Sequence, residues 1–92
     1  MPVVHLARHL YRFFPALEGR QLRVQAATAA EVVRALEALQ PGFAFYICDE
    51  LGRLRRHVNM FVGDEHIHDR TALSDAMPPE AEVYIMQSLS GG

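Results

Sequence analysis

Lysine is absent from the sequence, and cysteine is represented by a single residue, Cys48. All nine basic residues are arginines, so no side-chain amine is available for extending the chain into lysine-linked polymers. One cysteine can neither close an internal disulfide nor supply a thiolate metal cluster. We expect Cys48 to be a small buried apolar side chain, and a reactive thiol is the alternative.

A strong net charge and a long hydrophobic run are missing as well. The formal net charge is −2 and the sequence pI is about 6.2, which gives no broad attraction to nucleic acid or to an anionic membrane. The first residues, MPVVH, lack the basic start and the apolar stretch of a signal peptide, and nothing resembles a spanning helix. We therefore expect a cytoplasmic protein that binds neither nucleic acid nor a membrane.

Half of the 92 residues are apolar, which suffices for one core and therefore for one domain. Residues 3–8 are predicted to form a strand that leads into a helical turn ending at Pro15, and residues 21–26 alternate as a second strand. Thr28 stands three residues before Glu31, which is the spacing of a capping box, and a stripe of apolar residues with helical spacing follows. A helix is therefore expected to begin at Thr28.

The second half of the chain contains strands separated by turns. Residues 43–51 are densely apolar without a clear period, and they predict an irregular or short helical connection. Residues 57–62 alternate as a strand, a Gly-Asp-Glu turn follows, and residues 66–68 return as its hairpin partner. A turn with two prolines introduces the final strand, residues 82–87.

The predicted order is hairpin, helix, hairpin and terminal strand. Because only one long amphipathic helix is available to cover a sheet, this order predicts an α+β fold of the β-grasp, or ubiquitin-like, type. We expect residues 1–87 to form a mixed sheet of four to five strands with one main helix packed on it. Residues 88–92 are then expected to be a flexible C-terminal tail.

The last five residues are SLSGG, and they follow directly on the final predicted strand. Gly91 and Gly92 carry no side chain, so this segment can enter a narrow cleft where any Cβ would collide. The group delivered there is a carboxylate, which is ionised at neutral pH and could attack a nucleotide phosphorus if an enzyme held both. The alternative is a chain end that is small and polar for no functional reason, or a cloning remnant.

Three features together resemble the MoaD/ThiS-type ubiquitin-like sulfur carriers over nearly the whole chain. They are the helix that begins at Thr28, the stretch GRLRRHVNMFVGDE at residues 52–65, and the final strand that runs into Gly-Gly. The middle stretch is similar to the third strand of the longer members, including the CysO-type carriers of cysteine synthesis. The chain departs from the family pattern at residues 78–80, where PPE replaces an Asp-Gly-Asp-type turn, and in a tail without the common prolines or alanines.

The resemblance implies a carrier that catalyses nothing itself. An E1-like adenylating enzyme of the MoeB/ThiF type would join the Gly92 carboxylate to AMP, and a sulfur donor would displace AMP to leave a thiocarboxylate. Gly91 and Ser90 would enter the partner's active site, and an acceptor enzyme would take up the sulfur. ATP and magnesium belong to the adenylating enzyme, so the chain is expected to hold no cofactor. It would be a protein co-substrate, or the small subunit of a sulfur-transfer enzyme complex.

Sheet parity predicts where a partner docks, because alternate side chains of a strand point to opposite faces. The positions expected to face the helix are Val58, Met60, Val62, Val83 and Ile85. The open face then carries three large apolar side chains, those of Phe61, Tyr84 and Met86. Such a patch is typical of partner-binding surfaces, although antiparallel sheets also leave such groups partly exposed without consequence.

Two further groups of residues give weaker signals. His66 and His68 share a strand face and could join His57 as metal ligands, but histidines on the surface of a hairpin are the expected interpretation, so no metal site is predicted. The arginines of RLRR at residues 53–56 could steer an acidic partner or bind phosphate. A solvated turn is the alternative there.

Two rival functions stay open on the sequence. In the first, the chain is a ubiquitin-like protein modifier that is joined through Gly92 to lysines of other proteins. In the second, it is a metal-dependent or simple non-catalytic binding module with an idle tail. The final sulfur acceptor is open too, because cysteine, molybdopterin, thiazole and tRNA pathways use related carriers. The longer middle segment favours the cysteine type.

Overall fold

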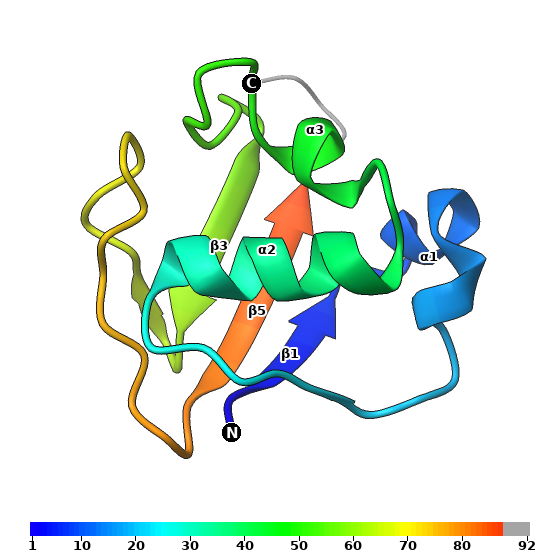
Figure 1. Cartoon of the computed structure of the whole chain (residues 1–92), viewed down its shortest axis with the longest axis horizontal. Coiled ribbons are helices and arrows are strands. Elements are labelled where there is room, and N and C mark those ends of the chain that lie inside the picture. Colours follow the sequence, from blue (N-terminus) through cyan, green and yellow to red (C-terminus); the bar gives the residue numbers. More distant parts are fainter. Residues whose placement is uncertain (88–92) are drawn as a thin grey trace.

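The computed structural model describes residues 1–87, in which the long helix α2 (Ala29–Leu39) crosses one face of a five-stranded sheet (Figure 1). The strands are β1 (Val3–Leu6), β2 (Leu22–Arg23), β3 (Val58–Val62), β4 (Glu65–His66) and β5 (Glu82–Gln87). The helices are α1 (Leu10–Phe13), α2 (Ala29–Leu39) and α3 (Phe43–Ile47), and a 3₁₀ turn, η1, spans Pro15–Leu17. Within the described residues no helix is long and apolar enough to cross a membrane.

The sheet is mixed, and its strands lie in the order β2-β1-β5-β3-β4. The central strand, β5, pairs in parallel with β1 and antiparallel with β3, whereas β2 and β4 are short edge strands paired antiparallel with β1 and β3. A parallel pair needs a long crossover, and here the connection from β1 to β5 contains α2 and the other strands. The predicted β-grasp fold is thereby confirmed.

The helix α2 begins where the capping box predicts. Thr28 has an extended backbone, and its Oγ1 accepts a hydrogen bond from the Glu31 backbone N–H at 3.2 Å. The Glu31 carboxylate in turn accepts a hydrogen bond from the Ala27 backbone N–H at 2.6 Å. The first bond satisfies an N–H group that every helix start leaves open, and the second fastens the incoming chain to the first turn.

β3 and β5 send alternate side chains into the core beneath α2, as predicted. Four of the helix-facing positions, Val58, Met60, Val83 and Ile85, are at most 1% exposed. Val62, at the end of β3, is partly buried and packs against the same core. The opposite positions of β3 and β5 therefore face away from the helix.

The segment without a clear period contains the short helix α3. Phe43 and Ile47 of this helix are fully buried, whereas Phe45 is 61% exposed. The helix follows Gly42, whose φ of 100° lies in the left-handed region that favours glycine. Because its apolar side chains are divided between core and surface, the sequence pattern of this segment shows no single buried face.

The edge strand β2 is shorter than the predicted span of residues 21–26. The Val24 backbone N–H still donates to the Pro2 carbonyl at 3.0 Å. Pro2 has no N–H of its own to return, so the ladder of paired bonds stops there. β1 also ends two residues earlier than predicted, where the chain turns into α1.

Candidate functional site

Gln87 is the last described residue and marks the place where the predicted tail leaves the domain. Its backbone pairs with Val58 at the start of β3. Its side-chain Oε1 lies 3.0 Å from His9 Nε2 and accepts a hydrogen bond from the Tyr46 hydroxyl at 3.3 Å. Strand pairing and two side chains from other elements therefore fix the end of β5 in place.

Ser90, Gly91 and Gly92 lie outside the described residues, so their predicted roles stay predictions. The structure does define the end of the sheet to which this segment is attached. Because β1 and β5 run parallel, with Val3 opposite Glu82, the start of the chain and Gln87 lie at opposite ends of the sheet (Figure 1).

The predicted docking residues lie on the sheet face opposite α2. Phe61 of β3 and Tyr84 of β5 are direct register partners, and Met86 lies opposite Asn59 on the same pair of strands. Phe61 and Tyr84 are partly buried, and Met86 is 37% exposed. The structure thus brings the three side chains to one face, and their role in docking stays a prediction.

Two histidines extend this face, and the sequence did not predict their place. His5 of β1 is the register partner of Tyr84, and their stacked rings have centroids 4.7 Å apart. His66 of β4 is the register partner of Phe61, with ring centroids 4.3 Å apart. His5, Tyr84, Phe61 and His66 therefore form one row of rings across four strands, which we call the aromatic row.

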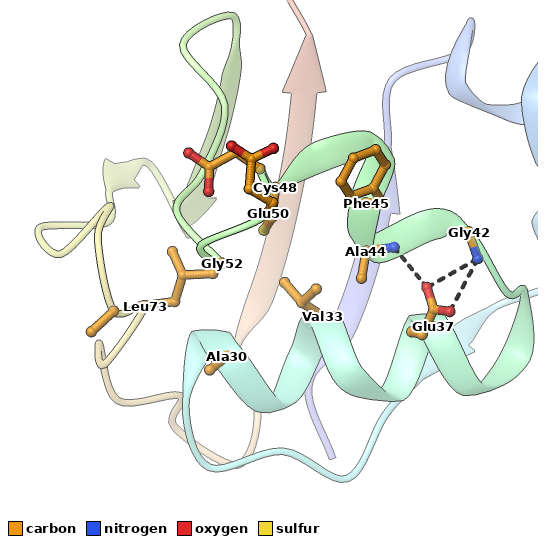
Figure 2. Close-up of a pocket in the computed structure, with 12 residues that line it drawn as sticks. Ala30, Val33, Glu37, Gly42, Ala44, Phe45, Cys48, Glu50, Gly52 and Leu73 are labelled. Atoms are coloured by element: carbon orange, nitrogen blue, oxygen red, sulfur yellow. Dashed lines mark hydrogen bonds between the residues drawn. The ribbon is translucent and has the colours of Figure 1, made fainter.

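A cleft of about 430 Å³ lies on the helical side, between α2, α3 and the loops that contain Gly52 and Leu73 (Figure 2). Ala30 and Val33 line it from α2, and the exposed ring of Phe45 stands at its rim. Most of its exposed lining is therefore apolar.

Glu37 ties α2 to α3 beside this cleft. Its carboxylate accepts hydrogen bonds from the backbone N–H groups of Ala44 at 2.8 Å and of Gly42 at 3.1 Å (Figure 2). The bonds from Ala44 and Gly42 hold the pKa of the Glu37 carboxyl below its ordinary value. Because its oxygens already bind the backbone of its own chain, Glu37 serves the fold and is a poor candidate for acid–base catalysis.

Cys48 lies at the inner side of the same cleft and is 5% exposed, so its predicted burial is confirmed. Burial raises the pKa of the Cys48 thiol, and the neighbouring Asp49 carboxylate acts in the same direction. A raised pKa keeps the sulfur protonated at neutral pH, where a thiol is a weak nucleophile and a weak metal ligand. The geometry therefore favours a structural thiol over a reactive one.

The histidines considered as metal ligands do not converge with other ligands. Among residues 1–87, no three His, Cys, Asp or Glu side chains are grouped so that they could hold a metal ion. His66 instead belongs to the aromatic row, and the loop at His68 is held by its backbone N–H, which donates to the Asp75 carboxylate at 2.9 Å.

The sequence matches no family model and no curated protein. Solved structures do match over nearly the full chain. A chain of the Amycolatopsis orientalis BexX/CysO complex matches with a TM-score of 0.83 and 19% identity, covering 100% of both chains. Mycobacterium tuberculosis CysO matches with a TM-score of 0.81 and 25% identity, covering 97% of this chain and 100% of that one.

SAMP1 from Haloferax volcanii, a small archaeal modifier protein, has a TM-score of 0.76 and 22% identity, covering 99% of this chain and 98% of that one. At such low identities the property that these chains share is the ubiquitin-like fold. The resemblance to CysO-type proteins is therefore confirmed in the structure of the domain.

Proposed function

We propose that this chain is a sulfur carrier protein whose working group is the carboxylate of Gly92. An E1-like adenylating enzyme, which itself holds ATP and Mg²⁺, transfers AMP to this carboxylate and releases pyrophosphate. A sulfur donor then attacks the acyl carbon, AMP leaves, and a terminal thiocarboxylate remains. The observation that carries the proposal is a β-grasp domain whose central strand, β5, leads directly into the sequence SLSGG.

The chemistry explains why a protein is used as the carrier. Gly91 and Gly92 have no side chains, so the tail can pass through a narrow opening. Five extended residues reach about 17 Å, which carries the carboxylate into an enzyme while the folded domain stays outside. The thiocarboxylate sulfur is nucleophilic, and attachment to a folded domain restricts its delivery to proteins that recognise that domain. The chain is accordingly a co-substrate, and its partners are the catalysts.

The proposed docking surface is the sheet face with Phe61, Tyr84 and Met86. Aromatic side chains and methionine are enriched in the buried centres of protein interfaces, and polar groups form the rims. His5 and His66 at the two ends of the aromatic row supply such a rim. Activation by ATP fits work in the cytoplasm, which is the compartment we propose for this chain.

The comparison proteins support the fold that a carrier needs, and one of them is named for the alternative function. The BexX/CysO complex contains a protein of this fold bound to a partner. SAMP1 is named as a modifier, so protein conjugation through Gly92 is kept as the alternative function. We place the carrier first because the two CysO structures superpose on this chain more closely than SAMP1 does.

The intact mass of the protein, purified from its native host, tests the proposal. A second sample is incubated with ATP, sulfide and the cognate adenylating enzyme, and its C-terminal peptide is sequenced by mass spectrometry. We expect replacement of one oxygen by one sulfur at Gly92, and no such change in a variant that lacks Gly92.

An unmodified carboxylate in the presence of an active adenylating enzyme would refute the carrier. An isopeptide bond between Gly92 and lysines of other proteins would identify the modifier instead. Both results are read from the same peptide maps, so the two candidate functions are distinguished in one experiment.

A further inference from the structure

Four of the nine arginines line one open cleft of about 490 Å³ beside the start of β3. They are Arg53, Arg55, Arg56 and Arg70, and we call them the basic cluster. One carboxylate, that of Asp49, also lines the cleft. A local excess of positive charge therefore exists in a chain whose formal net charge is −2.

The basic cluster adjoins the place where the tail leaves the sheet. Val58 pairs with Gln87 at the end of β5, and Arg56 comes two residues before Val58. On the other side of β5, the Ala7 backbone N–H donates to the Ile85 carbonyl at 2.9 Å, which brings the next residue, Arg8, to the same end of the sheet. Positive charge thus flanks the end of β5 on both sides.

Two of the four guanidinium groups are held in place by neutral acceptors. Arg55 donates from Nε and Nη2 to the Phe45 carbonyl at 3.0 and 2.9 Å, and its guanidinium lies 4.9 Å from the centre of the Phe45 ring. Arg70 donates from Nη2 to the carbonyls of Arg55 and Val58 at 2.7 and 2.8 Å. Such bonds order the side chains without neutralising their charge.

Within residues 1–87, the carboxylate paired with the basic cluster is that of Asp49, whose Oδ2 lies 2.9 Å from Arg53 Nε. Arg56 is exposed to solvent. Four cations therefore face one anion across this cleft, and the balance remains positive.

Carboxylates gather at the opposite end of the same strands. Asp64 and Glu65 follow the end of β3, and Glu80 and Glu82 stand at the start of β5. The length of β3 separates these two ends by about 13 Å, which exceeds the Debye length of about 8 Å at physiological salt. These four carboxylates therefore offset little of the positive charge of the basic cluster at the end of β5.

We propose that the basic cluster docks on an acidic surface of the adenylating enzyme, around the opening through which the Gly92 segment enters. This inference rests on the proposed function and names the charge of the partner surface. A protein surface fits better than a small phosphate ligand, because much of the donor capacity of Arg55 and Arg70 is already used by backbone carbonyls. What remains is an oriented positive field, which speeds association with an acidic partner.

Binding kinetics of two matched variants test the proposal. Arg56→Gln removes one exposed charge from the basic cluster, and Arg34→Gln removes one exposed charge from α2. We expect Arg56→Gln to lower the association rate constant with the adenylating enzyme about threefold at low salt, and Arg56→Glu about tenfold. The difference should shrink at high salt because the charges are screened. Arg34→Gln should bind like the wild type.

Two results would overturn the proposal. One is an equal association rate, with equal salt dependence, for Arg56→Gln and Arg34→Gln. The other is saturable binding of inorganic phosphate or ATP to the free wild-type chain that Arg56→Gln abolishes, which would assign the cluster to a small anion. Failure of the proposed function has a different signature, because the wild type would then dock without gaining sulfur at Gly92, or would not dock at all.

Discussion

Met60 and Phe61 are neighbours in β3, and their side chains point to opposite faces of the sheet. Truncating each in turn therefore tests the contribution of the core to stability separately from the contribution of the docking surface to binding. Met60 is fully buried, and Met60→Ala should cost about 2–5 kcal/mol of unfolding free energy. A domain of this length has roughly 5–14 kcal/mol in total. At about 4–8 °C per kcal/mol, a 3 kcal/mol loss lowers Tm by roughly 12–24 °C.

Phe61 is only partly buried, and its main identified ring contact is with His66. Loss of that contact removes about 0.5–1.5 kcal/mol, so Phe61→Ala should lower Tm by no more than about 12 °C. If Phe61 anchors the interface, its truncation costs about 2 kcal/mol of binding. This corresponds to a roughly 30-fold weaker Kd for the adenylating enzyme.

Thermal unfolding followed by circular dichroism and a Kd measured at 25 °C test both halves of this argument. Met60→Leu, which keeps the side chain's approximate volume, serves as the control for the core and should lose less than about 1.5 kcal/mol. A loss of stability in Phe61→Ala as large as in Met60→Ala would refute the register of β3. An unchanged Kd for Phe61→Ala would refute the docking surface.

Three further predictions concern the stability and reactivity of the domain. Thr28→Ala should lose about 1 kcal/mol in urea unfolding because the Glu31 N–H loses its cap, and Thr28→Ser should stay near the wild type; equal stability of all three proteins would contradict the cap. Hydrogen bonds from the Ala72 N–H, the Ser74 hydroxyl and neighbouring N–H groups lower the pKa of Asp69 to about 2. The stabilising effect of the ionised Asp69 carboxylate should therefore be present above about pH 4 and be lost as the pH falls through about 2. Over this range the free energy of unfolding of Asp69→Asn should fall less than that of the wild type. Cys48 should react with a thiol reagent slowly in the native protein and rapidly in urea, and fast native labelling would contradict its burial.

The parts of the fold that the sequence predicted correctly depend on contacts close along the chain. The capping box at Thr28 involves residues three apart, and it placed the start of α2 correctly. Alternation within one strand gave β5 its observed span, Glu82–Gln87, and assigned Met60 to the core. Local spacing and burial on one face suffice for predictions of this kind.

The parts that could not be predicted depend on pairing between distant segments. The aromatic row needs the parallel register of β1 and β5, which sets His5 beside Tyr84 although the two residues come from opposite ends of the chain. The basic cluster needs Arg70 to fold back onto the carbonyls of Arg55 and Val58. Neither contact produces a periodic pattern in the sequence, because each joins residues that are far apart along the chain.

The parallel register of β1 and β5 also keeps the amino group of Met1 away from the end of β5, where the C-terminal segment begins. The chain has no lysine, and the Met1 ammonium, which donates to the Pro79 carbonyl at 2.8 Å, lies at the end of the sheet opposite Gln87 (Figure 1). The basic cluster, by contrast, lies at the end where β5 finishes. Guanidinium groups are always protonated at neutral pH, so they provide charge without being acylated. The arginines near the end of β5 could therefore attract a partner. They would not compete with the sulfur donor for the acyl group of an activated Gly92.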